Sequence, residues 1–169
     1  MSASYDLKVA GPGIDVPDSG DGPSFRRIFV PVRLPGESAE ALAAAARVCG
    51  STINGVLRLV HVRMYDPPMP RCPSRFYPET AAEAAALLDE ALLVVWDGGA
   101  QATTTAVVEA PRREVAAAIA RQASAWRADV IVLTRRRRPA ISRVVLGSVA
   151  DQVMHKASCP VLTVHPKRK

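Results

Sequence analysis

Short apolar runs alternate along the chain with longer segments in which apolar residues recur at helical spacing. Runs of this length, rich in apolar and β-branched residues, are typical of strands buried on both faces of a sheet. The pattern therefore predicts strands at 28–32, 56–62, 103–108, 130–133 and 161–164.

The segments between these strands carry the signals that start and stop helices. Thr80 and Glu83 have the spacing of a capping box, and so do Ser148 and Asp151. Helices are predicted at 38–49, from 80 to the glycines at 98–99, at 113–126, and from 148 to the Cys-Pro pair at 159–160. Strands that alternate with helices predict an α/β fold: a doubly wound five-stranded parallel sheet with helices on both faces.

The two ends of the chain differ in composition from the middle. Residues 1–24 are rich in Gly, Pro, Asp and Ser, so they bury too little apolar surface to repay the entropy of ordering. We therefore predict a flexible N-terminal arm at 1–24, one domain at 25–166 and a basic tail at 167–169.

The composition argues against a membrane protein, a secreted disulfide-rich protein and a metalloprotein. Of 169 residues, 49% are hydrophobic, but no run approaches the roughly 20 apolar residues that cross a bilayer. No signal peptide is visible, and the three cysteines follow no disulfide or metal-binding spacing with the histidines. The expectation is a cytoplasmic protein without a membrane segment or a metal site.

The predicted topology indicates where a ligand would bind. In doubly wound sheets, ligands bind beyond the carboxyl ends of the strands, where the strand order reverses. This rule brings together Pro31–Arg33, Val62–Arg63 and the loop after Leu133. That loop ends at Gly147–Ser148, where free amides at the start of a helix favour an anion.

Five sequence segments together resemble the universal stress protein family: Ile28–Val32, Leu59–Val62, Ala128–Leu133, Leu146–Val153 and Ala157–Val164. The resemblance implies the nucleotide-binding alpha-hydrolase-like fold, a cytoplasmic location and no established catalysis. It also implies a homodimer through the last strand, composed of Val161, Leu162, Thr163 and Val164.

Many members of that family bind ATP through two spaced glycines followed by Gly-Ser or Gly-Thr, and through an Asp after the first strand. Here Thr134 and Arg137 stand at the two glycine positions, Arg33 stands at the Asp position, and only Gly147–Ser148 is retained. We therefore expect a degenerate ATP motif and no bound cofactor. The residues that ATP with magnesium would use in the alternative case are Val32, Arg33, Val62, Leu133, Thr134, Arg137, Gly147, Ser148 and Val149.

The run Arg135–Arg138 is open to three interpretations: a solvated loop, a phosphate site that replaces the lost glycines, or a surface for a polyanion or an acidic protein. Sequence-specific nucleic-acid binding is disfavoured, because no aromatic residues alternate with the arginines and no recognition-helix motif is present.

No catalytic residue is predicted. His61 lies at a strand end, but the sequence indicates neither an acidic partner nor a nucleophile for it. Cys159 precedes a buried strand and is interpreted as a packed, inert thiol. The favoured hypothesis is a non-catalytic, homodimeric universal stress protein-like module in stress response or regulation, with a possible protein partner.

Overall fold

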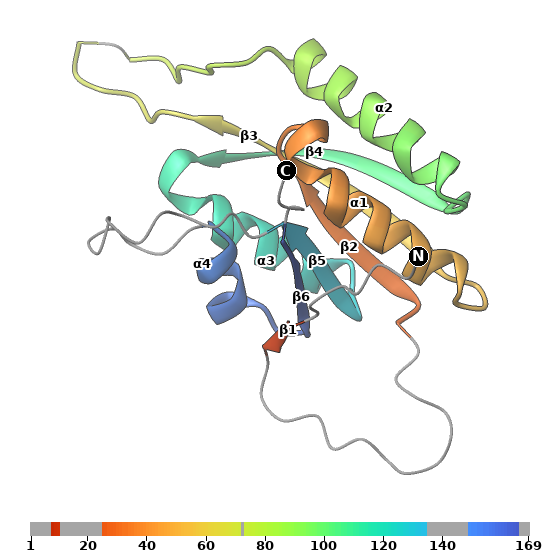
Figure 1. Cartoon of the computed structure of the whole chain (residues 1–169). Coiled ribbons are helices and arrows are strands. Elements are labelled where there is room, and N and C mark those ends of the chain that lie inside the picture. The colour runs from red at the N-terminus through yellow and green to blue at the C-terminus, as the bar shows by residue number, and fades with distance from the viewer. Residues whose placement is uncertain (1–7, 11–24, 72, 135–148, 166–169) are drawn as a thin grey trace.

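The computed structural model describes residues 8–10, 25–71, 73–134 and 149–165 (Figure 1). They form one sheet with helices on both faces. The strands are β1 (Lys8–Ala10), β2 (Arg27–Val32), β3 (Val56–Tyr65), β4 (Thr103–Pro111), β5 (Val130–Thr134) and β6 (Val161–Val164). The helices are α1 (Pro35–Gly50), α2 (Ala81–Asp97), the 3-10 turn η1 (Arg112–Glu114), α3 (Val115–Ala125) and α4 (Val149–Lys156).

The strand order is β1-β6-β5-β2-β3-β4. The neighbours from β6 to β4 are parallel, whereas β1 runs antiparallel to β6. The order reverses between β2 and β5, because β3 and β4 continue on one side of β2 and β6 lies on the other side of β5. The predicted doubly wound five-stranded parallel sheet is confirmed.

Strand β1 is a sixth strand that the sequence analysis did not predict: Lys8 pairs with Thr163 and Ala10 pairs with Val161. Of residues 1–24, the structure describes only these three, so the flexible N-terminal arm stays a prediction. The dimer through Val161, Leu162, Thr163 and Val164 also stays a prediction, and β1 would lie beside the same edge. A strand of three residues has no period to detect, and its partner lies at the other end of the chain.

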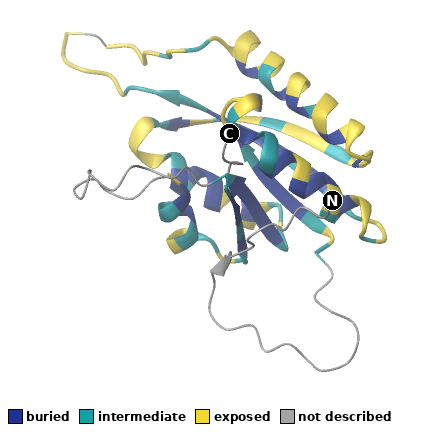
Figure 2. Cartoon of the chain, viewed as in Figure 1, coloured by how far each residue is buried: buried dark blue, intermediate teal, exposed yellow. Residues whose placement is uncertain are grey.

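The core has two halves, one on each face of the sheet (Figure 2). On one face, α1 and α2 cover side chains of the central strands such as Ile28, Val30 and Leu59. On the other face, Phe29, Val60 and Ile131 pack against residues of α3 and α4. Neighbouring residues of β2 thus enter opposite halves, as expected of a strand buried on both faces.

Several element boundaries differ from the predicted ones, and three of the differences have a clear cause or lie near the site. Helix α1 begins at Pro35 rather than 38, because proline fits the first turn, where its missing N–H is no loss. Strand β3 continues to Tyr65, since β4 pairs with it as far as Pro111. Helix α3 is preceded by η1 and ends at Ala125, one residue before the predicted end. Among the described residues, no helix is long and apolar enough to cross a membrane.

Candidate functional site

The point where the strand order reverses is an opening between β2 and β5. The two strands pair at Ile28 with Val130 and at Phe29 with Ile131, and this pairing ends before Pro31. Proline has no N–H to donate to a neighbouring strand, so it suits the place where two strands separate. The carboxyl ends of β2 and β5 therefore lie at the predicted ligand position.

The structure brings several predicted site residues to this edge of the sheet. Val32, Val62 and Leu133 are buried in β2, β3 and β5, each in the carboxyl-terminal half of its strand. Thr134 follows Leu133, and its buried hydroxyl has no hydrogen-bond partner among the described residues. Val149 is the first residue of α4 and is exposed. The other three candidates, Arg137, Gly147 and Ser148, lie outside the described residues.

Arg33, directly after β2, is turned toward α1. Its guanidinium lies 3.5 Å from the Glu37 carboxylate, one helical turn along the same segment, and remains 68% exposed. Its backbone N–H donates to Ser38 Oγ over 3.3 Å. A guanidinium offers donors only, so this position presents no acceptor to a ligand.

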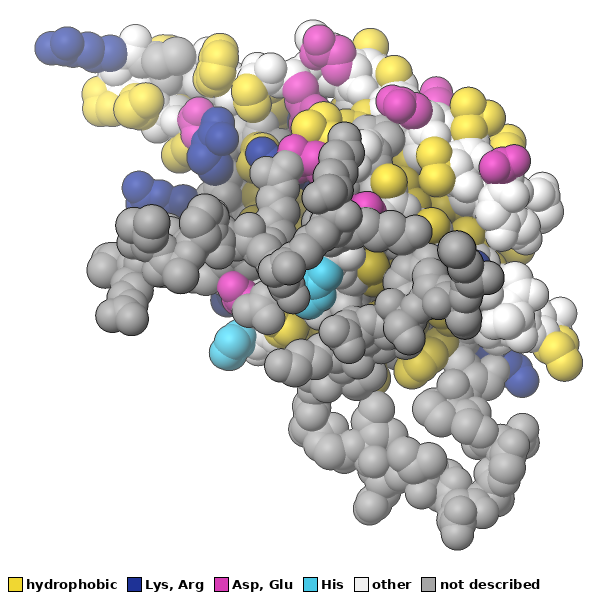
Figure 3. All heavy atoms as spheres, in the orientation of Figure 1, with side chains coloured by type: hydrophobic (Ala, Val, Ile, Leu, Met, Phe, Trp, Pro, Cys, Tyr) yellow, Lys and Arg dark blue, Asp and Glu magenta, His cyan; other side chains and the backbone are white. Residues whose placement is uncertain are grey.

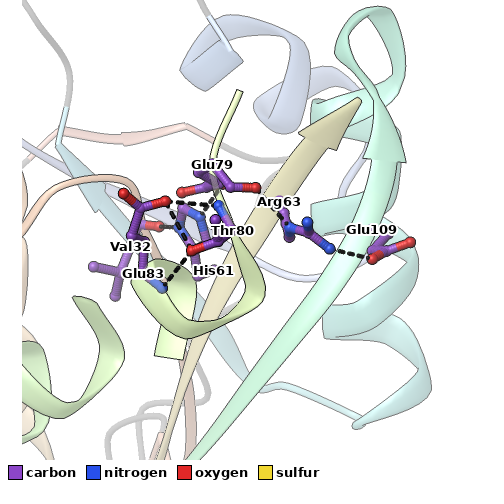
Figure 4. Close-up of polar contacts among 7 residues, drawn as sticks. All are labelled: Val32, His61, Arg63, Glu79, Thr80, Glu83 and Glu109. Carbon is purple, nitrogen blue, oxygen red and sulfur yellow. Dashed lines mark hydrogen bonds and ion pairs between the residues drawn. The ribbon is translucent and has the colours of Figure 1, made fainter. Parts of the chain in front are cut away.

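His61, near the end of β3, is buried and fully hydrogen-bonded (Figure 4). Its Nδ1 lies 2.9 Å from the carbonyl oxygen of Val32, and its Nε2 lies 2.8 Å from Glu79 Oε1. The expectation that His61 has no acidic partner is therefore wrong. The partner comes from the segment before α2, 18 residues farther along the chain.

The two hydrogen bonds of His61 define how its ring is oriented. A carbonyl only accepts, so Nδ1 must carry a hydrogen and donate it to Val32. The other ring nitrogen, Nε2, faces the Glu79 carboxylate. His61 thus joins β2, β3 and the segment before α2. Neither partner is a nucleophile, and the arrangement is that of a structural brace.

A second set of contacts extends this brace along β3. Arg63 donates from Nε to the Glu79 carbonyl over 3.0 Å and from Nη1 to Glu109 Oε1 over 2.9 Å. The Tyr77 hydroxyl donates to the other Glu109 oxygen over 2.6 Å. The Tyr77 hydroxyl, and then Arg63, lower the pKa of Glu109 because they stabilise its ionised form. We call Val32, His61, Arg63, Glu79 and Glu109 the β3 brace.

Helix α2 begins immediately after the brace, with the predicted capping box in place. The Glu83 N–H donates to Thr80 Oγ1, and Glu83 Oε2 accepts from the Thr80 N–H over 2.7 Å. This backbone N–H, followed by the Thr80 hydroxyl, lowers the pKa of Glu83. The cap fixes the direction in which the chain enters α2, and Glu79 is the residue before it.

Cys159 is poorly suited to act as a nucleophile. Burial raises the pKa of the Cys159 thiol, and the negative charge of Asp129 raises it further. The thiolate, which is the nucleophilic form, is therefore disfavoured. In the described part of the chain, no group of three or more His, Cys, Asp or Glu residues is placed to hold a metal ion.

Sequence reasoning missed Glu79 and the brace built on it. Glu79 lies at the end of a proline-rich segment, residues 67–78, whose path relative to the sheet the sequence leaves open. One signal was available, because Glu79 directly precedes the capping box and a helix start fixes the neighbouring residue in space. That signal gives a position for Glu79 but does not identify His61 as its partner.

Comparisons with known proteins agree with this architecture. A family model described as the universal stress protein family matches residues 24–165. A universal stress protein solved in complex with cAMP is 20% identical, with a TM-score of 0.63 over 85% of this chain and 99% of that one. No curated protein matches the chain.

Two similar structures come from Archaeoglobus fulgidus. One universal stress protein is 26% identical, with a TM-score of 0.60 over 83% of this chain and 98% of that one. The other was solved in complex with dAMP and is 23% identical, with a TM-score of 0.61 and the same coverage of 83% and 98%.

Proposed function

Because the chain belongs to the universal stress protein family, we propose that it is a non-catalytic, cytoplasmic module of the stress response that does not use the family's ATP site. It acts as a homodimer and transmits its signal through protein surfaces. The resemblance supports the location and the absence of catalysis, and the residues at the end of β2 support the loss of the nucleotide.

The single observation that carries this proposal is the state of Arg33. The resemblance implies an Asp here, whose carboxylate would accept hydrogen bonds from a nucleoside. Arg33 cannot accept, and its guanidinium lies 3.5 Å from Glu37 instead. A ligand at the end of β2 would therefore meet a donor where its own hydroxyl or amino group needs an acceptor.

The β3 brace engages a second acceptor at the same place. The carbonyl of Val32 accepts from the imidazole of His61, which is itself tied to Glu79. One of the two lone pairs of this carbonyl is therefore already used, and a ligand would have to share the oxygen with the imidazole. Both changes weaken the part of the site that would hold the nucleoside rather than its phosphates.

Nucleotide binding is the alternative function, and two similar proteins favour it because they were solved with cAMP and with dAMP. In this case Gly147, Ser148 and the nearby arginines would hold the phosphate groups. Arginine makes charge-assisted, bidentate contacts with phosphate, so affinity would come from the charged end of the ligand.

Isothermal titration separates the two functions. The protein, freed of any co-purified nucleotide, is titrated with ATP and Mg²⁺, with cAMP and with dAMP. We expect no binding tighter than about 1 mM. An Arg33→Asp variant restores the acceptor and is the matched gain-of-binding control. Micromolar binding by the unmodified protein that is lost in Gly147→Val would overturn the proposal and establish a nucleotide sensor.

A further inference from the structure

The chain between β3 and α2 projects beyond the carboxyl end of β3 (Figure 1). This proline-rich segment, residues 67–78, carries prolines at 67, 68, 70, 73 and 78. Residues 67–71, which lead outward from β3, are all exposed. Figure 3 shows basic and hydrophobic side chains at the outer end of the segment. Packing in the core therefore does not explain why prolines stand at these positions.

The base of the segment is fixed to the sheet. The Asp66 N–H donates to the Phe76 carbonyl over 2.9 Å, and the Phe76 N–H donates to the Asp66 carbonyl over 3.3 Å. Arg112 Nε lies 3.2 Å from Asp66 Oδ1, and the Arg75 guanidinium lies 4.5 Å from the centre of the Tyr65 ring. Both limbs of the segment are thus held, and the residues between them are presented at a defined place.

The acidic residues next to the segment have partners of their own. Asp66 pairs with Arg112, and Glu79 pairs with His61. Within residues 67–71, Arg71 is the one charged side chain. We call Pro67–Arg71 the proline motif. It combines three prolines and Met69, which is 62% exposed, with a single positive charge.

The proline motif has few backbone conformations open to it. The proline ring fixes φ at about −65° at positions 67, 68 and 70. A residue that precedes proline is confined to the extended and polyproline II region, which applies to Asp66, Pro67 and Met69. In the structure, residues 67 and 68 belong to neither a helix nor a strand. The motif is therefore extended before any partner binds, and little conformational entropy is left to lose.

The spacing of the prolines matches a known mode of recognition. Polyproline II has about three residues per turn, so side chains three positions apart lie along the same edge. Pro67 and Pro70 share one edge, and Pro68 and Arg71 share another. Prolines at this spacing bind to grooves lined with aromatic side chains, and a guanidinium beside them pairs with a carboxylate.

We propose that the proline motif is the docking site for a partner protein with a groove that binds polyproline II. Aromatic side chains of the partner receive Pro67 and Pro70, and an acidic side chain of the partner pairs with Arg71. Carbonyl oxygens of the motif accept hydrogen bonds from tyrosine or tryptophan in the groove, because polyproline II makes no internal hydrogen bonds. The inference rests on the proposed role of protein surfaces, and it names one such surface and the chemistry of its partner.

Other occupants fit the proline motif less well. Proline has no N–H, so three of the five residues cannot donate to a neighbouring strand, which disfavours the addition of a strand. Nucleic acids and anionic membranes are bound by clusters of basic residues, whereas Arg71 is the single cation of the motif. A groove that binds prolines and one positive charge uses both features that the motif presents.

Isothermal titration of the full chain with a panel of purified SH3 and WW domains tests the proposal, because these domains bind polyproline II segments. We expect a domain whose groove ends in an acidic residue to bind with a dissociation constant below about 1 mM. The double variant Pro67→Ala/Pro70→Ala removes both groove contacts and loosens the backbone, so the dissociation constant should rise more than about tenfold. Arg71→Glu places like charges together and should raise it about tenfold.

Pro78→Ala and Arg113→Glu are the matched controls, since both residues are exposed and lie outside the proline motif. They are expected to leave the dissociation constant unchanged, and circular dichroism checks that every variant keeps the fold. Failure of every domain to bind at about 1 mM would overturn the proposal. So would binding that survives Pro67→Ala/Pro70→Ala. These titrations contain no nucleotide, so the nucleotide titration decides the loss of the ATP site separately.

Discussion

The end of β2 and the middle of β3 lie side by side in the sheet but are fixed in different ways. In the middle of β3, buried His61 bonds to Val32 and Glu79, which are 29 and 18 residues away in the sequence. At the end of β2, Arg33 pairs with Glu37 within one helical turn, and its side chain is 68% exposed. The first arrangement joins three segments, whereas the second stays within one.

This difference separates a structural position from one that is free to vary. Breaking a buried, hydrogen-bonded pair leaves groups without a partner or water. An exposed pair four residues apart is replaced by water at little cost. The end of β2 is therefore a position that can change without loss of the fold, which is what the proposed loss of the ligand anchor at Arg33 requires.

The largest effect is expected from His61→Phe. Phenylalanine fills a similar volume but donates no hydrogen bond, so the Val32 carbonyl and the Glu79 carboxylate both lose their partner. Because Glu79 is partly exposed, we expect a loss of about 2–3 kcal/mol rather than the upper end for buried pairs. The free energy of unfolding in urea at pH 7 measures it.

Glu79→Gln is the matched control for His61→Phe. The glutamine amide offers both donors and an acceptor, so it keeps a hydrogen bond with Nε2, and we expect less than half of the loss caused by His61→Phe. A His61→Phe protein within about 0.5 kcal/mol of the wild type would show that the brace does not stabilise the fold. The contrast between His61, as a structural residue, and Arg33, as a residue free to vary, would then be wrong.

A smaller effect is expected from Thr80→Ala, at the helix cap that directly follows Glu79, the partner of His61. Loss of the N-cap hydroxyl costs about 1 kcal/mol. Carboxyl NMR titration follows the same change at Glu83, whose pKa is lowered first by the Thr80 backbone N–H, which the variant keeps. We expect the pKa of Glu83 to rise only part of the way to its ordinary value of 4.5.

The pH dependence of this contribution has a defined sign. The folded-state pKa of Glu83 lies below its unfolded value, so its contribution is complete above about pH 4.5. It is lost as the pH falls through the lower folded-state value. A Glu83 pKa at or above the ordinary value of 4.5 in the wild type would contradict the capping box.

Much of the fold can be predicted from the periodicity of apolar residues. The parts that periodicity misses were missed for physical reasons. The strand from Val130 and the helix beginning after Thr80 carry dense local signals, and both are where the sequence predicts them. Strand β1 was missed because Lys8–Ala10 pairs with β6, more than 150 residues away. A strand held by a distant edge is stabilised by tertiary pairing rather than by its own residues.

The candidate site divides in the same way. Burial of Val32, Val62 and Leu133 at one edge follows from the α/β topology alone. The role of His61 does not follow from the topology, because its pairing with Glu79 depends on how the proline-rich segment before α2 returns to the sheet. The spacing of residues along the chain does not predict the path of that segment. Arg137, Gly147 and Ser148 remain predictions from sequence.

The smallest effect is expected from Arg33→Ala, at the end of β2. The Arg33–Glu37 pair is four residues apart and largely in water, so its removal costs about 0.3–0.5 kcal/mol. A double-mutant cycle with Glu37→Ala isolates the pairwise term in urea unfolding at two salt concentrations. The coupling should fall at 1 M salt, where exposed charges are screened.

A coupling above about 1.5 kcal/mol that does not respond to salt would mean that Arg33 is fixed as firmly as His61. The two positions would then be constrained alike, and Arg33 would be a structural residue rather than a replaced ligand anchor.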